Sequence, residues 1–192
     1  MVHMIQSPPD EQLMEAVASG DGHAFDALVR RHLPRAYAIA RRVLSNQADA
    51  EEAAQDAFTK IWVKAADWQP DRAKFTTWLH RIVVNSALDM ARKRTPGFVA
   101  DAEAVLATLP DATPNIEAQL GQAEQQALVR QAVATLTPEQ RAAVTLCYFE
   151  HYTNVEAAKM LGINLKALEG LLVRARKKLR ETLGPMEHRH AA

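Results

Sequence analysis

The sequence predicts an all-α protein made of two small helical domains joined by a flexible linker. Its 192 residues are 48% hydrophobic and 24% charged, which suits one medium core or two small ones. The alternation of polar and apolar residues that marks half-buried strands is nearly absent, whereas apolar residues recur at helical spacing. The sequence therefore predicts a first domain over 10–95, a linker over 96–115, a second domain over 116–184 and a tail over 185–192.

The first domain is expected to begin with a short helix near Asp10. The stretch GDGHAF, residues 20–25, ends that helix and starts the next one. Apolar residues from Leu28 to Val43 then keep helical spacing. After Asn46 a further helix is predicted, because its apolar positions follow the i, i+3, i+4 rhythm up to Trp62.

A last helix of this domain is predicted over 75–94, after the break at Pro70 and Asp71. Its apolar stripe leaves Arg81, Asn85 and Arg92 on a second face. An amide between two guanidinium groups can bond a base edge while its neighbours hold phosphates. This face is therefore a candidate nucleic-acid surface.

Trp68, in the loop WQPDRAK, permits two interpretations. Its ring can stack on an unpaired base beside Arg72 and Lys74. Alternatively, it closes the end of the preceding helix as a hydrophobic plug, and the residues alone favour neither interpretation.

The second domain has clear helix boundaries. A helix is expected over 116–135, and Thr137 to Gln140 form a capping box with proline at the first helical position. Thr153 to Glu156 repeat the capping box, Gly162 ends that short helix, and Asn164 caps the next, which Gly184 and Pro185 stop. This order predicts a helix-turn-helix motif with a longer second helix over 165–183.

The charge distribution favours a polyanionic partner although the net charge is zero. Basic residues are in excess over 61–100 and again over 141–192, and acidic residues are in excess between these segments. Two basic modules on an acidic connector are typical of nucleic-acid binding. The alternative is that both basic segments are ordinary solvated faces.

Catalysis, cofactors and metals are not indicated by any motif. The chain has no nucleophile with a local base, no glycine-rich phosphate loop and no zinc-binding pattern, so we expect neither enzyme activity nor a cofactor nor a metal. No apolar run is long enough to insert into a membrane, and the first residues lack the features of a signal peptide. With Cys147 as the single cysteine, we expect a cytoplasmic protein.

The ordered motifs resemble the sigma factors of bacterial RNA polymerase, of the short extracytoplasmic-function (ECF) type, group IV of the sigma-70 family. The resemblance covers about Glu11 to Leu183. The segments that carry it are SGDGHAFDALVRRH, DAEEAAQDAFTKIW, FTTWLHRIVVNSALDMARKR, LTPEQRAAVTLCYFEHYTNVEAAKMLGI and RARKKLRETL. It implies a region-2 domain and a region-4 domain that together direct promoter recognition, strand opening and transcription initiation at stress-type promoters.

The resemblance also implies partners and sites. The partners are core RNA polymerase, through its beta-prime and beta subunits, promoter DNA, and an anti-sigma protein that regulates the factor. Core polymerase would contact the polar face formed by Asp49, Glu52, Gln55 and Asp56. The −10 promoter element would contact Trp68, Lys74, Arg81, Asn85 and Arg92. The −35 element would contact Lys166, Glu169, Gly170, Arg174, Arg176 and Lys177 on the last helix.

The last helix departs from the family pattern at residues 169–171. The family usually has a basic residue, a serine and another basic residue there, whereas this chain has Glu169, Gly170 and Leu171. Glu169 is interpreted either as an acceptor for a cytosine amino group or as a solvated residue beside packing leucines. The leucines of this helix also suggest apolar surface for a protein partner.

The altered helix supports an alternative function. The chain could be a sigma-like decoy that sequesters an anti-sigma factor without binding DNA. Against that alternative stand the intact Trp68, Asn85 and basic face over 81–94.

Overall fold

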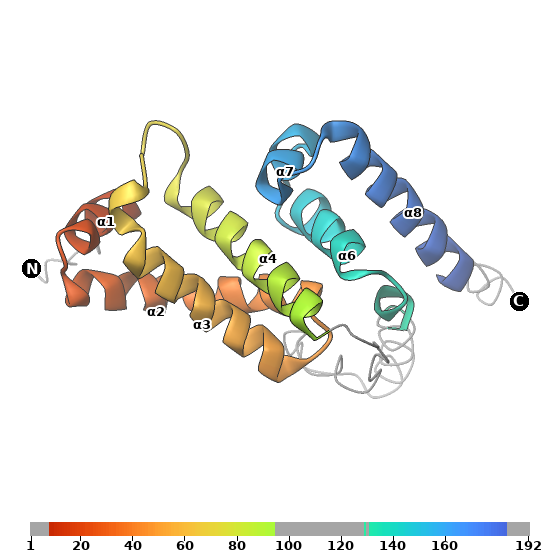
Figure 1. Ribbon diagram of the computed structural model, residues 1–192, viewed down its shortest axis with the longest axis horizontal. Helices are drawn as coiled ribbons and strands as arrows, with labels where there is room; N and C mark the ends of the chain where they lie inside the picture. The colour runs from red at the N-terminus through yellow and green to blue at the C-terminus, as the bar shows by residue number, and fades with distance from the viewer. Residues whose placement is uncertain (1–7, 95–128, 130, 184–192) are drawn as a thin grey trace, which may run out of the picture.

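The computed structural model describes residues 8–94, 129 and 131–183, in which the secondary structure is helical and contains no strand. The first group of helices comprises α1 (Asp10–Ala18), α2 (Gly22–Val43), α3 (Gln47–Val63), the 3-10 turn η1 (Ala65–Asp67) and α4 (Phe75–Lys93). The second group comprises α6 (Pro138–Val144), the π-helical turn η3 (Thr145–Phe149), α7 (Asn154–Leu161) and α8 (Leu165–Leu183). Figure 1 shows the two groups side by side. The predicted all-α class is confirmed.

The expected linker and tail, 96–115 and 185–192, lie outside the described residues. Most of the helix expected over 116–135 lies outside them as well, and residues 131–134 are its described helical end.

Local capping explains where the helices begin. The Asp21 carboxylate accepts from the backbone of His23 and Ala24 at the start of α2, and Asn46 caps α3. Both predicted capping boxes form, at Thr137 before α6 and at Thr153 before α7. Because these side chains satisfy backbone N–H groups that have no partner within the helix, they fix the boundaries that the sequence predicted.

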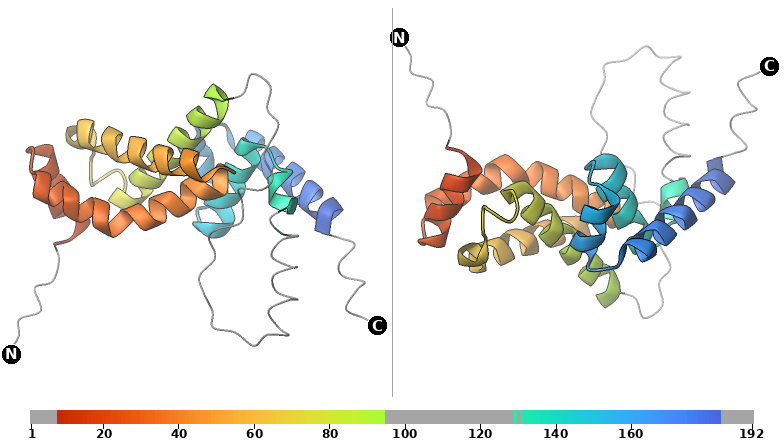
Figure 2. Two further views of the ribbon diagram at one scale, coloured as in Figure 1. Left: turned by 90° about the horizontal axis from the view of Figure 1, so that it is seen from below. Right: turned by 90° about the horizontal axis from the view of Figure 1, so that it is seen from above.

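The helix-turn-helix also forms as predicted. Gly162 ends α7 in the left-handed conformation with φ 67°, which glycine adopts without a steric penalty. Asn164 then accepts a hydrogen bond of 2.8 Å from the backbone of Ala167 and so starts α8. In the views of Figure 2, α8 extends away from the body of the molecule, so one long side of this helix is free of the other helices.

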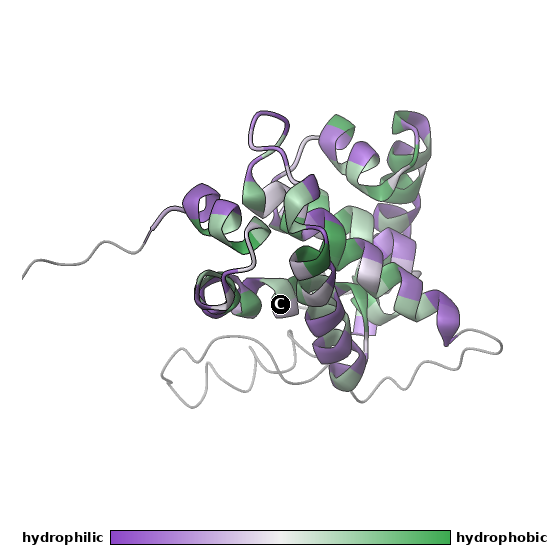
Figure 3. Cartoon of the chain, turned by 60° about the vertical axis from the view of Figure 1, so that its left-hand side comes forward, coloured by the Kyte–Doolittle hydropathy of each residue, from purple (hydrophilic) through white to green (hydrophobic). Residues whose placement is uncertain are grey.

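The core runs through both groups of helices. Buried residues of α1–α4, such as Leu28, Ile39 and Leu79, belong to the same hydrophobic cluster as Leu146 and Leu168 of the second group. Apolar residues gather between the helices and hydrophilic residues cover their outer faces (Figure 3). Because the cluster is continuous, the second group packs against α2 and α4 of the first.

Candidate nucleic-acid and polymerase interfaces

Helix α8 separates a packing face from an exposed basic face. Leu168 and Leu172 are 0% and 2% exposed and pack inside the second group. The predicted −35 residues Lys166, Glu169, Arg174, Arg176 and Lys177 are all exposed. The interpretation that leucines of this helix pack is confirmed for these two residues, and the expectation that they offer surface to a partner is corrected.

Gly170 leaves room for the guanidinium of Arg174, one turn further along α8. A Cβ atom at Gly170 would lie 3.2 Å from Nη1 of Arg174, which is closer than an ordinary contact. Arg174 therefore lies against the backbone of α8 at the position where the family pattern has a larger residue. Glu169, beside it, projects into solvent.

The residues on and before helix α4 that were predicted to contact the −10 element differ in exposure. Lys74, at its N-cap, and Arg81 are exposed, and Arg92 is exposed and pairs with Asp89 at 3.0 Å. Asn85 is half-buried instead, because its Nδ2 donates a hydrogen bond of 3.2 Å to the carbonyl oxygen of Met160 in α7. In this arrangement the second group covers the amide that was predicted to meet a base.

Trp68 fills the core beside the start of α4. Its side chain is only 9% exposed, and its ring lies edge-on to Phe75 with the centroids 6.4 Å apart. The ring has no open face for a base here. The plug interpretation therefore describes Trp68 in this structure, and the expectation of an accessible stacking residue is corrected.

The acidic face of α3, formed by Asp49, Glu52, Gln55 and Asp56, also contains both buried and exposed side chains. Asp49 is buried, and its carboxylate forms an ion pair of 2.6 Å with Arg94. Burial raises the pKa of Asp49, although the Arg94 charge opposes that shift. The expectation that Asp49 is available to a partner is corrected, whereas Glu52 and Gln55 are exposed and Asp56 pairs with Lys60 at 2.6 Å.

An open groove of about 750 Å³ lies between α2 and α3 and was missed in the sequence. Gln55 and Thr59 line it with the apolar side chains of Phe25, Leu33 and Trp62. Trp62 is 41% exposed and Leu33 is 38% exposed, although periodicity placed Trp62 in the core. The groove joins the exposed part of the acidic face to an apolar surface, which is the composition of a protein-docking site.

Other kinds of site do not appear in the part of the chain that the structure describes. Its histidine, cysteine and acidic side chains form no group of three that could hold a metal ion. No helix among the described residues is long and apolar enough to cross a membrane.

The fold agrees with the sequence comparisons. Residues 28–96 match the family described as Sigma-70 region 2, and residues 126–179 match the family described as Sigma-70, region 4. The chain is therefore a sigma factor of the sigma-70 family, a transcription initiation factor and not an enzyme.

Its relatives define the type of sigma factor. The chain is 36% identical to the ECF RNA polymerase sigma factor SigM of Mycobacterium tuberculosis over 91% of this chain and 85% of the relative. It is 35% identical to the ECF RNA polymerase sigma factor SigE of Mycolicibacterium smegmatis over 92% of this chain and 70% of the relative. The chain thus belongs to the ECF sigma factors, which act with core RNA polymerase on promoter DNA.

Two solved structures share the fold. CnrH, in complex with the cytosolic domain of CnrY, is 29% identical with a TM-score of 0.60, covering 92% of this chain and 98% of that chain. The sigma factor RpoE, in complex with the anti-sigma factor NepR from Bartonella quintana, has a TM-score of 0.63 at 23% identity, covering 83% of this chain and 96% of that chain.

Proposed function

We propose that this factor directs polymerase, in the cytoplasm, to a small set of stress-type promoters, with α8 on the −35 element and α4 on the −10 element. The observation that carries the proposal is that α8 has one buried apolar side and one exposed basic side. Leu168 and Leu172 hold one side of the helix in the core, while Arg174, Arg176 and Lys177 remain exposed on the rest. An exposed basic helix after a helix-turn-helix turn suits the major groove and its phosphates.

In this proposal, the −10 element meets α4. Exposed Lys74, Arg81 and Arg92 supply backbone contacts, and the Asn85 amide bonds the edge of an extruded base. Trp68 supports the start of α4 from within the core.

The groove between α2 and α3 is proposed as the docking site for the beta-prime coiled coil of core polymerase. Gln55 is a polar residue of its lining, and Trp62 and Leu33 are apolar residues of the lining. Glu52 is exposed on the same helix as Gln55. An aromatic anchor with a polar rim is a usual arrangement for a protein interface. Asp56, held by Lys60, lies on the same helix.

Regulation by an anti-sigma protein is also proposed. Its support is the likeness to CnrH, whose structure contains the cytosolic domain of CnrY, and to RpoE, whose structure contains an anti-sigma factor. The half-buried Leu171 on α8 is a candidate contact for such a protein.

The test is reconstitution of the chain with core RNA polymerase and transcription over a promoter library. We expect initiation at a restricted set of promoters. Asn85→Ala should reduce open-complex formation about tenfold, because a good base-edge contact contributes about 1–3 kcal/mol, and should leave core binding unchanged. Trp62→Ala should instead weaken core binding. Absence of specific initiation under every condition would reject the proposal and favour the decoy.

A further inference from the structure

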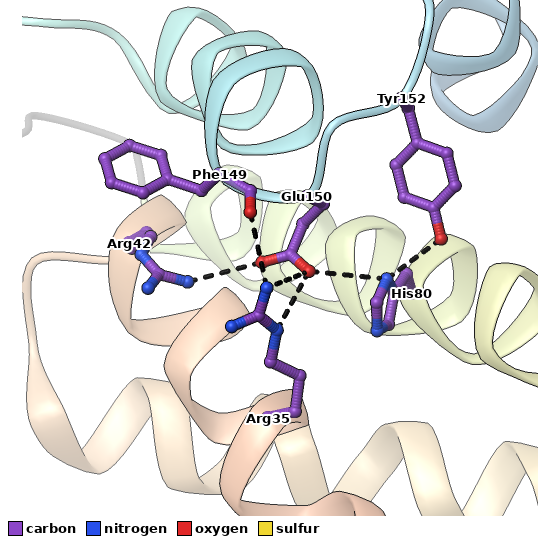
Figure 4. A network of polar contacts seen from close by, with 6 residues as sticks. All are labelled: Arg35, Arg42, His80, Phe149, Glu150 and Tyr152. Atoms are coloured by element: carbon purple, nitrogen blue, oxygen red, sulfur yellow. Dashed lines mark hydrogen bonds and ion pairs between the residues drawn. The ribbon is translucent and has the colours of Figure 1, made fainter.

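The carboxylate of Glu150 is buried between the two groups of helices. Its side chain is 2% exposed although it follows directly after the turn η3. Arg35 of α2 binds Oε2 at 2.8 Å and 2.9 Å, and Arg42 of α2 lies 3.4 Å from Oε1 (Figure 4). Nδ1 of His80 in α4 lies 3.6 Å from Oε2. One acidic side chain of the second group is thus held by two arginines of the first, with His80 beside it.

Neighbouring residues complete this contact, as Figure 4 shows. The hydroxyl of Tyr152 lies 3.0 Å from Nδ1 of His80, and Arg35 also donates to the carbonyl oxygen of Phe149 at 3.3 Å. The guanidinium of Arg42 lies 4.6 Å from the ring centroid of Phe149. Residues 149–152 therefore act as one unit that docks on α2 and α4.

The backbone of the second group is shaped to present this unit. The π-helical turn closes with the Glu150 N–H donating to the carbonyl oxygen of Thr145 at 3.0 Å. His151 then adopts φ 57°, a left-handed conformation that residues other than glycine seldom use. Both π-helical turns and left-handed residues other than glycine are frequent at functional sites of proteins. Their effect here is that Glu150 and Tyr152 both point at the first group.

Two more hydrogen bonds cross the interface away from Glu150. Nε of the buried Arg141, in α6, donates to the carbonyl oxygen of Val43, the last residue of α2, at 2.7 Å. A guanidinium at a helix C-terminus is favoured by the helix dipole. Asn85 donates to Met160, as described above. The interface thus uses side chains of α2 and α4 to close the molecule, and Asn85 is among them.

The polar character of these contacts makes the closed arrangement reversible. A carboxylate between arginines stabilises the contact only while its partners are in place, because taking the charge out of water offsets much of the attraction. Arg35 and Arg42 are still 49% and 33% exposed, so water reaches them and separation leaves no stranded charge. Polar contacts of this kind occur between domains that part and meet again, and here they lie beside the hydrophobic cluster that both groups share.

We propose that Glu150 is an internal lock: it holds the region-4 domain against α2 and α4 and so withholds Asn85 from promoter DNA until the factor opens on core polymerase. This inference rests on the proposed function, because it assumes that Asn85 contacts the −10 element. It needs no second protein. The chain itself keeps the free factor from binding promoters.

The lock is tested with the full chain labelled at one exposed site in each group. Ala66→Cys and Thr182→Cys, in a Cys147→Ser background, carry a donor and an acceptor dye. In the free protein, Glu150→Gln should lower energy transfer, because the distance between the groups increases. The same variant should bind single-stranded DNA carrying the −10 element of the best promoter from the library about tenfold more tightly.

Controls separate the lock from a general effect of charge. Glu181→Gln removes an equally charged side chain that is 61% exposed and pairs only weakly with Lys177, and it should change neither readout. Arg35→Gln with Arg42→Gln should open the protein as Glu150→Gln does. Combining all three changes should add little, because they remove one shared interaction.

Unchanged energy transfer in Glu150→Gln would overturn the lock. Opening without tighter DNA binding would overturn the inhibition and leave Glu150 as a plain domain contact. Failure of every variant to initiate at any promoter would reject the proposed function, and the inhibition with it. Energy transfer would still decide whether Glu150 holds the domains.

Discussion

At the scale of single residues, exposure decides which cations of α8 are available to DNA. Lys178 donates to the carbonyl oxygen of Thr135 at 2.7 Å and so supports the domain. Lys177 is 78% exposed and has only a distant ion pair with Glu181, at 3.9 Å. Two adjacent lysines with the same charge therefore differ in their contacts, and Lys177 is the better candidate for a phosphate contact.

Lys177→Ala should weaken promoter binding with little dependence on sequence. A lysine that neutralises one phosphate releases about one counterion, so the slope of log affinity against log salt should fall by about one. Fluorescence anisotropy with duplex −35 DNA over a salt series measures this slope. A loss confined to one promoter sequence would contradict the phosphate role and would indicate base reading.

At the scale of elements, the helix boundaries follow from residues that lie next to one another in the chain. At the start of α7, Thr153 and Glu156 cap the backbone through the capping box, and Gly162 ends the helix in the left-handed conformation. Asn164 caps the start of α8. None of these needs a residue from elsewhere in the chain. The π-helical turn at 145–149 has no such local signal, because no side chain caps its start.

Replacing Gly170 with alanine should stabilise α8. Glycine inside a helix costs roughly 0.5–1 kcal/mol relative to alanine, and only the flexible end of Arg174 would have to move. Urea unfolding of the full chain should show a free energy of unfolding higher by about that amount. Gly162→Ala is the matched control, with the opposite sign, since its φ of 67° disfavours a side chain. A stabilising effect of both changes would contradict this account.

At the scale of the whole molecule, the two groups of helices share one core, and a titratable residue lies in the interface between them. His80 faces Tyr152 and Glu150 of the second group and Arg35 of α2. Burial first, and then the charges of Arg35 and His32, lower the pKa of His80 to about 4 from its ordinary 6.5. The closed arrangement therefore holds this imidazole neutral.

Acidification should open the molecule. In the closed molecule His80 binds a proton less readily than in the open one. The stabilisation of the closed arrangement by neutral His80 is therefore fully present above pH 6.5 and is lost as pH falls toward 4. The opening constant should therefore be larger at pH 5.5 than at pH 7.5. Energy transfer between the labelled groups measures this change, and His80→Asn should remove its pH dependence. An equal pH response in His80→Asn would assign the effect to another group.

The sequence predicted which basic residues of α4 and α8 are exposed, because these helices carry them at helical spacing. Arg81, Arg92, Arg174 and Lys177 are exposed as their periodicity indicated. Asp49 and Trp68 are buried instead, because a polar face or a loop aromatic can be covered by other parts of the fold. Arg94 covers Asp49, and Trp68 packs on Phe75.

By itself, the sequence determined the helical class, the helix ends and the family, because capping, glycine placement and periodicity act between residues a few positions apart. Only the tertiary structure decided how the two groups meet. Glu150 gives no local sign of its partners, since Arg35 and Arg42 precede it by more than a hundred positions. A buried carboxylate is stable only where such partners converge, and that convergence is a property of the packed chain.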